Sequence, residues 1–334
     1  MRKRQVRAED SIVIFYLTLP ESPPHPLSRR PQPAWRGGVH RDKPEKEIKA
    51  DVHQGPVTIQ TVLSIIGAMD SDRLLCCLPA VDQEPQKSRT RPSGCDQPEF
   101  YWIFKDMDFH QWRSTNGMRK VLWLSGPAEC RISDASSHIV DLAKETFPVG
   151  QHSVLYFFCS TAPMRIPIAI TFVSTIVRQL VHCTPRFKRE IINSFLRTLL
   201  DTVLEEERLS NPKVPLFNAD DSAEAMVEKI LKASSDAYWS ALRAIPDIGQ
   251  EKGLSLIIDG LDKIEDQKSE FIQKLLLFIE YLEERPSTTR VLLTSRPQAE
   301  IKEILGRWPS IEYDRERRGM IHLISYSRDK RGGS

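Results

Sequence analysis

Residues 254–262 have the sequence LSLIIDGLD, a mostly apolar run that ends at Asp259 and is soon followed by a second carboxylate, Asp262. Apolar residues at consecutive rather than alternating positions are typical of a strand that is covered on both faces. The carboxyl ends of such strands form the ligand-binding edge of a parallel sheet. Asp259 is therefore a candidate Mg²⁺ ligand and Asp262 a candidate for orienting water, although Asp and Gly also favour an ordinary turn after a strand.

Three further apolar runs predict strands of the same sheet, and a fifth strand is expected around 310–313. The runs are 121–125 (VLWLS), 152–160 (HSVLYFFCS) and 290–294 (RVLLT). Helical patterns lie between them, at 133–144, 168–181, 184–208 and 271–282. Thr184 followed by Pro185 predicts an N-cap and a first helical residue. Alternating strands and helices predict an α/β fold, a three-layer sandwich around a mostly parallel central sheet.

The run at 290–294 is followed by Ser295, Arg296 and a proline, so Thr294 and its neighbours place two hydroxyls and a guanidinium at the edge shared with Asp259. A guanidinium there is suited to bidentate pairing with a γ-phosphate. The alternative is that Arg296 only caps the following helix. Thr294 and Arg296 are therefore candidate nucleotide-binding residues.

Residues 126–133 (GPAECRIS) follow the first predicted strand, where a phosphate-binding loop of the pattern GxxxxGK[ST] would lie. In that pattern, backbone N–H groups surround the phosphates, the lysine reaches the β and γ oxygens and the hydroxyl binds Mg²⁺. Gly126 and Ser133 match the pattern. Arg131 replaces its second glycine and Ile132 its lysine. Ser133 is thus a candidate Mg²⁺ ligand beside Asp259.

Three substitutions in this loop oppose phosphate binding. Ile132 brings no charge, Arg131 adopts a positive φ less readily than glycine, and Glu129 adds a negative charge beside the expected phosphates. A hydrogen bond to a charged group contributes about 1.5–3 kcal/mol. Loss of two such bonds from the lysine predicts ATP binding weakened by roughly two to four decades.

In their order and spacing, these segments resemble the NACHT-like P-loop NTPase domain of nephrocystin-type proteins, over about residues 98–325. The matching segments are an aromatic lead-in (Tyr101, Trp102, Ile103, Phe109 and Trp112), the strand and glycine at 121–126, the acidic segment at 256–262, the LLTSRP segment at 292–297 and the stretch 311–318. The family comprises STAND-class signalling ATPases that are abundant in filamentous fungi. The resemblance implies ATP or ADP with Mg²⁺ as cofactors, with Gly126, Arg131, Ile132, Ser133, Thr294 and Arg296 around the nucleotide.

The resemblance and the altered loop together predict a degenerate NACHT-like module that acts as a signalling switch or scaffold. The alternative is an active Mg²⁺-dependent ATPase, with Asp259 on the metal, Asp262 positioning water, Arg296 sensing the γ-phosphate and Arg131 replacing the lysine. The expected partners are proteins, either related STAND NTPases or further copies of this chain. Because no sensing repeat follows the expected fifth strand, we interpret the chain as a fragment, a short paralogue or the product of a decayed gene.

The chain outside this domain is polar and rich in proline. Residues 1–56 are expected to form a disordered basic arm: the first 50 residues hold 7 of the 23 prolines, 11 basic and 6 acidic residues. Such an arm could tether nucleic acid or lipid, or be a solvated tail. Residues 57–97 are expected to form short helices and, from 79, a linker, and 326–334 a disordered tail.

Overall composition excludes several classes of protein. The 334 residues carry 47 Lys and Arg against 45 Asp and Glu, a charge too balanced for a dedicated nucleic-acid-binding protein. No stretch reaches the ~18 consecutive apolar residues of a membrane span. The six cysteines form no CxxC pair, so neither a zinc site nor a disulfide framework is predicted. Reduced thiols and the lack of a signal sequence predict a cytoplasmic protein.

Overall fold

The computed structural model describes residues 57–90, 101–114, 120–146, 152–162, 165–210, 216–218, 220–245, 253–284 and 289–313. The chain divides into two units, 1–51 and 52–334, and every described residue belongs to the second. The predictions for the basic arm, for the 326–334 tail and for a domain limit at 325 lie outside the described residues.

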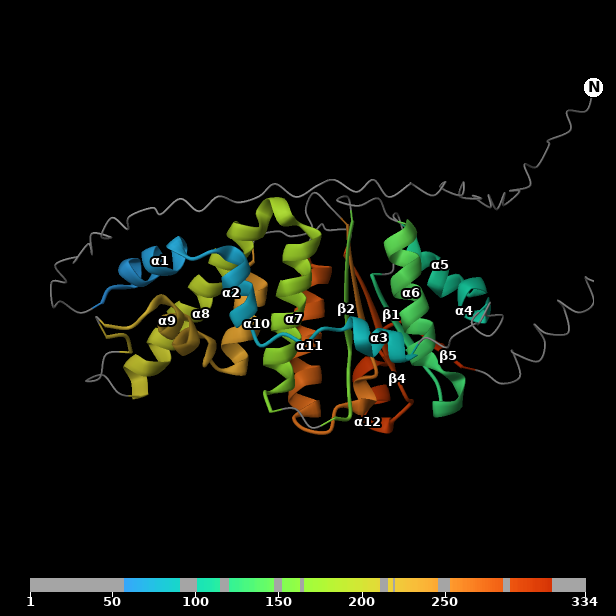
Figure 1. Cartoon of the computed structure of the whole chain (residues 1–334). Coiled ribbons are helices and arrows are strands. Elements are labelled where there is room, and N and C mark those ends of the chain that lie inside the picture. The colour runs from blue at the N-terminus through green and yellow to red at the C-terminus, as the bar shows by residue number, and fades with distance from the viewer. Residues whose placement is uncertain are drawn as a thin grey trace, which may run out of the picture. The chain divides into compact units, whose positions relative to one another are not determined.

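Five parallel strands form one sheet in the order β2-β3-β4-β1-β5 (Figure 1). Their bounds are β1 (Val121–Ser125), β2 (His152–Phe158), β3 (Gly253–Asp259), β4 (Thr289–Ser295) and β5 (Ser310–Glu312). The predicted strands are thus confirmed to within two residues. β4 lies between β1 and β3, so the segments that follow these three strands meet at one edge of the sheet.

Helices cover both faces of the sheet. In chain order they are α1 (Ile59–Ala68), α2 (Ser71–Cys77), α3 (Glu84–Thr90), α4 (Tyr101–Lys105), α5 (Met107–Arg113), α6 (Ile132–Thr146), α7 (Ile168–Cys183), α8 (Lys188–Ser210), α9 (Ala223–Leu231), α10 (Ser235–Ala244), α11 (Lys268–Glu283) and α12 (Ala299–Leu305). Short 3-10 turns add η2 (Ala128–Cys130), η3 (Pro185–Phe187) and η4 (Leu261–Lys263).

Alternate side chains of the strands enter two separate hydrophobic cores, which gives the three layers that the sequence predicts. Leu122 and Leu124 of β1 pack with α4, α5 and α6, whereas Val121 and Trp123 of the same strand pack with α7, α8, α10 and α11. Figure 1 shows α6 and α7 on opposite sides of the sheet. Because both faces are covered, the strands are apolar at consecutive positions.

Small polar residues begin several helices, as capping preferences predict. The side chains of Asp70, Asp106, Ser222 and Ser234 each accept a hydrogen bond from a backbone N–H in the first turn of α2, α5, α9 and α10. These bonds satisfy N–H groups that have no partner within the helix. The helices α9 and α10 were not anticipated from apolar spacing, although their capping serines are visible in the sequence.

The expected linker from residue 79 contains a helix, α3, which corrects the prediction made from its prolines. Pro85 falls in the first turn of α3, where a helix does not need its N–H. Polar side chains also hold this segment on the domain: Oε1 of Gln83 accepts a hydrogen bond from the Phe158 N–H at 2.7 Å, and Lys87 pairs with Asp141 at 2.7 Å. Tertiary contacts thus outweigh the linker-like composition.

The predicted N-cap at Thr184 has the right position but a different role. Its hydroxyl donates to the Leu180 carbonyl at 2.7 Å, and so ends α7 rather than capping the turn that follows. Pro185 opens η3, as predicted, before α8 begins at Lys188. Among the described helices, none is long and apolar enough to cross a membrane.

Candidate functional site

The loop between β1 and α6 makes a tight turn that is close-packed at Gly126 and left-handed at Arg131. A Cβ atom on Gly126 would come within 2.5 Å of the Cys130 Sγ and 2.7 Å of the Tyr313 Cβ, so close packing requires glycine. Arg131 has φ of 52° and ψ of 42°, the left-handed conformation that the second glycine of the pattern would supply. The loop therefore adopts the turn into α6 in spite of an unfavourable residue.

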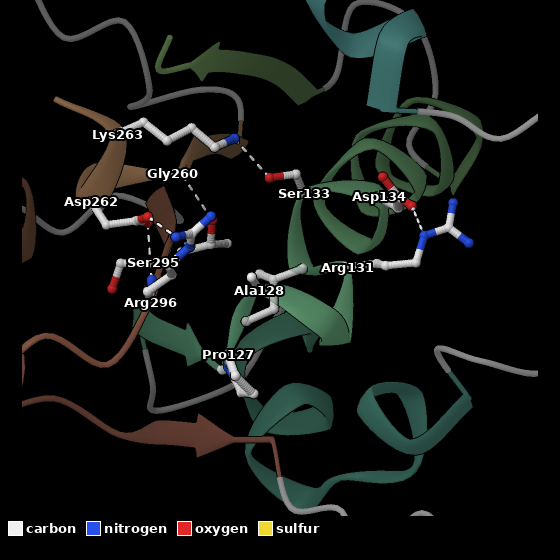
Figure 2. A pocket seen from close by; sticks show the side chains of 13 residues that line it. Pro127, Ala128, Arg131, Ser133, Asp134, Gly260, Asp262, Lys263, Ser295 and Arg296 are labelled. Atoms are coloured by element: carbon white, nitrogen blue, oxygen red, sulfur yellow. Dashed lines mark hydrogen bonds and ion pairs between the residues drawn. The ribbon is translucent and has the colours of Figure 1, made fainter. Parts of the chain in front are cut away.

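The Arg131 side chain is held by the helix that it precedes. Its Nε lies 2.5 Å from Oδ2 of Asp134, and Figure 2 shows the guanidinium extending along α6, away from Asp262 and Arg296. The neighbouring Ile132 is partly buried and packs against the core beneath α6. At the two positions where the pattern has glycine and lysine, the chain thus has an ion-paired arginine and a packed apolar residue.

Asp259 ends β3 as a completely buried carboxylate that is surrounded by donors. Oδ1 accepts hydrogen bonds from the hydroxyls of Ser136 at 2.8 Å and Thr294 at 2.7 Å. Oδ2 accepts one from Ser133 at 2.7 Å and is 3.0 Å from the Lys263 ammonium. Two carboxylate oxygens offer about four lone-pair sites, so these four groups satisfy the buried charge.

Lys263 reaches this carboxylate from η4, immediately after β3. Its Nζ lies 2.9 Å from the Ser133 hydroxyl, a contact that Figure 2 shows. The same Nζ is 3.0 Å from Oδ2 of Asp259. Gly260 has φ of +75°, and a Cβ on it would lie 2.8–2.9 Å from the last three atoms of the lysine side chain. Gly260 therefore supplies both the turn and the space that bring Lys263 back to the end of β3.

Asp262 and Arg296, predicted to act on water and phosphate respectively, bind each other. Oδ1 of Asp262 accepts a hydrogen bond from the Arg296 N–H at 2.9 Å, and Oδ2 is 3.4 Å from the Arg296 Nε. The Thr294 hydroxyl, besides donating to Asp259, accepts from the Gly260 N–H at 3.0 Å. In this structure all three residues help to join the turn after β3 to the end of β4 and to Arg296, which follows it.

A cavity of about 340 Å³ opens above these residues. It is lined by Gly126, Pro127, Ala128, Arg131, Ile132, Ser133, Asp134, Gly260, Asp262, Lys263, Thr294, Ser295 and Arg296 (Figure 2). The structure thus brings all the predicted residues to one edge of the sheet, with Asp259 beneath the cavity. Glu129 is exposed and does not line the cavity, so the charge repulsion expected from it is not built into this site.

The cysteine in the loop is not activated. Cys130 is buried and its Sγ donates to the Pro127 carbonyl at 2.8 Å. Burial raises its pKa to about 11, which outweighs the nearby backbone N–H groups at the start of α6. Burial, with Asp259 close by, also raises the pKa of Cys159. Both shifts oppose formation of the thiolate that nucleophilic catalysis uses.

Sequence analysis missed two functional groups of this site, Lys263 and Ser136. Lys263 follows Asp262 directly and lies four residues after Asp259. A lysine at this position, in a chain whose loop lacks its lysine, was the signal that could have identified it. Ser136 lies one helical turn after Ile132, on the face of α6 that meets β3. A serine in an expected helix gives no comparable indication.

Comparison with known families finds a match over part of the chain. The profile of the family described as nephrocystin 3, N-terminal, matches residues 100–208, from the segment before β1 to the end of α8. The chain is therefore nephrocystin-like over this region, which starts close to the expected limit but is shorter than 98–325. Asp259, Lys263 and Arg296 lie beyond it. No curated protein and no solved structure matches the chain.

Proposed function

We propose that the chain is a NACHT-like P-loop module that does not hydrolyse ATP and acts as a signalling switch or scaffold through protein contacts. The observation that carries the proposal is the start of α6, where the partly buried, uncharged Ile132 packs against the core at the position of the phosphate-binding lysine. The Arg131 guanidinium does not replace that lysine, because it is paired with Asp134. Nucleotide binding is consequently weak or lost.

The remaining geometry supports an origin in a phosphate-binding scaffold. The loop after β1, the carboxylate that ends β3 and the hydroxyls after β4 share one sheet edge, where ligands of open parallel sheets bind. The first turn of α6 directs the positive end of its dipole toward the cavity. The scaffold of the site is therefore retained, whereas the charged group that would hold the β and γ phosphates is missing.

The proposed partners are proteins, either related nucleotide-binding modules or a second copy of this chain. One support is the nephrocystin-like match. Another is that polar side chains of the site, such as Asp262 and Arg296, bind one another instead of being arranged to act on a substrate. Sedimentation velocity of the full chain at several concentrations tests self-association. Co-purification with a nephrocystin-type NTPase tests the related partner, and failure of both measurements would contradict the scaffold role.

Calorimetric titration with ATP and Mg²⁺ tests the nucleotide part of the proposal. We expect no measurable binding for the full wild-type chain and measurable binding for an Arg131→Gly/Ile132→Lys variant, which restores the loop pattern. The restored lysine should recover the roughly two to four decades of affinity that its hydrogen bonds represent. Micromolar binding and hydrolysis by the wild type, both abolished by Asp259→Asn, would establish an active ATPase instead.

A further inference from the structure

The ammonium of Lys263 lies where a P-loop protein holds its divalent cation. In such proteins the loop serine or threonine and the carboxylate after the acidic strand bind Mg²⁺. The corresponding groups here are Ser133 and Asp259, and Lys263 Nζ is 2.9 Å from the hydroxyl of the first and 3.0 Å from Oδ2 of the second. The residues that would hold the metal are thus bound to a cation of the chain itself.

The other oxygen of this carboxylate is also fully hydrogen-bonded. Oδ1 of Asp259 accepts hydrogen bonds from two hydroxyls, and the carboxylate is completely buried. Mg²⁺ dehydrates reluctantly and demands near-ideal octahedral oxygen geometry. To bind here it would have to displace an ammonium from a buried charge, which leaves the ammonium partly buried without its counter-ion. The described residues therefore do not fit a Mg²⁺ ion at this position.

The local backbone is shaped for the lysine. Gly260 permits the positive φ at the end of β3, and the lysine side chain passes so close to it that a Cβ there would collide with the last three side-chain atoms. The side chain of Lys263 is only 28% exposed, whereas that of Lys232, in a surface ion pair, is 70% exposed. The contact is consequently part of the fold and not a loose surface pairing.

We infer that Lys263 replaces the divalent cation of this site, so that the module is independent of Mg²⁺ and any phosphate group that enters the cavity meets a fixed ammonium. The inference rests on the proposed P-loop nature of the site. It requires that removal of the lysine uncovers a cation site formed by Ser133 and Asp259. That site would bind a hard divalent ion through oxygen ligands.

Lys263→Met in the full chain tests this inference, with Mn²⁺ as a spectroscopic probe for the Mg²⁺ position. We expect the melting temperature of the variant to fall by several degrees, because Asp259 loses its counter-ion, and to recover on addition of Mg²⁺ or Mn²⁺. The melting temperature of the wild type should not change with Mg²⁺. The wild type should also leave the electron paramagnetic resonance signal of free Mn²⁺ undiminished. Lys232→Met, a matched change at an exposed ion pair, should behave as the wild type does.

Two further variants keep the test decisive. Lys263→Arg retains a cation and should remain insensitive to Mg²⁺, whereas Asp259→Asn/Lys263→Met removes both charges and should lose the Mn²⁺ binding gained by Lys263→Met. Mn²⁺ binding by the wild type at Asp259 would overturn the inference even if the variants failed to fold. Tight nucleotide binding by the wild type without a metal would contradict the proposed function, in which nucleotide binding is weak or lost. It would leave the inference about Lys263 intact, so the two proposals can fail separately.

Discussion

The hydroxyl of Ser133 donates to Oδ2 of Asp259 at 2.7 Å, and this contact joins the first turn of α6 to the end of β3. These are the two positions at which the sequence predicts Mg²⁺ ligands. Their contact shows that the loop after β1 and the acidic strand meet at one edge of the sheet, with Lys263 bound to both. Ser133, Lys263 and Thr294 are therefore joined through Asp259 in one hydrogen-bonded network.

Thr294→Val should destabilise this network without changing the volume of the side chain. The Thr294 hydroxyl donates to Asp259 and accepts from the Gly260 N–H, and the side chain is buried. Its loss leaves two buried groups with one partner fewer, which costs about 1–3 kcal/mol. Urea denaturation measures the change. Thr202→Val, whose hydroxyl only donates within α8, is the control, and an equal loss in both variants would contradict the network.

Gly253→Ala should destabilise the pairing of β2 with β3. A Cβ at Gly253 would lie 2.0 Å from Nδ1 of His152, its partner on the neighbouring strand. The ring would have to move and lose its hydrogen bond to Ser255, so we expect a loss of about 1–3 kcal/mol. Gly67→Ala in α1 meets no atom within 4 Å and should stabilise the chain by about 0.5–1 kcal/mol. Similar effects of the two substitutions would be inconsistent with this packing.

Acidification should destabilise the chain through His152 between pH 6.5 and about 4. Burial, together with the charge of Arg290, lowers the pKa of His152 from 6.5 to about 4, so the folded state holds the ring neutral. Below pH 6.5 the unfolded state binds the proton first, and stability falls until the pH reaches the folded pKa. We expect unfolding midpoints of the wild type to fall more steeply in this range than those of His152→Gln. Parallel pH profiles would contradict the buried neutral imidazole.

Cysteine reactivity should follow burial and not the proximity of a helix N-terminus. Cys76 and Cys77 are exposed, whereas Cys130 and Cys159 are buried with raised pKa values. Iodoacetamide at pH 8 should therefore modify Cys76 well before Cys130 in the native chain, and both at similar rates in urea. Peptide mass spectrometry distinguishes the sites. Rapid native modification of Cys130 would indicate an activated thiol in the loop.

The strands and the position of the site could be predicted because both follow from short-range patterns. Consecutive apolar residues required strands covered on both faces, and parallel pairing then placed Gly126, Asp259 and Ser295 at the same edge. The conformation of the loop at Arg131 was harder to predict, because arginine seldom adopts a positive φ. The ion pair with Asp134 accompanies that conformation in the structure.

The interactions within the site could not be predicted, because they depend on side chains that approach one another only after the sheet forms. Asp262 and Arg296 were each expected to face a ligand, but they are 34 residues apart and meet through the adjacent ends of β3 and β4. The position of Lys263 depends likewise on the turn at Gly260. The helix α3 was missed because Gln83 and Lys87 find partners that are distant in sequence.

Titration of the full chain with a fluorescent ATP analogue, with and without Mg²⁺, tests the central claim most directly. The wild type should show no saturable binding, and Arg131→Gly/Ile132→Lys should bind without a Mg²⁺ requirement because Lys263 still holds the cation position. Adding Lys263→Met to that variant should make its binding depend on Mg²⁺. Micromolar, Mg²⁺-dependent binding by the wild type would contradict both the lost phosphate contact and the built-in cation.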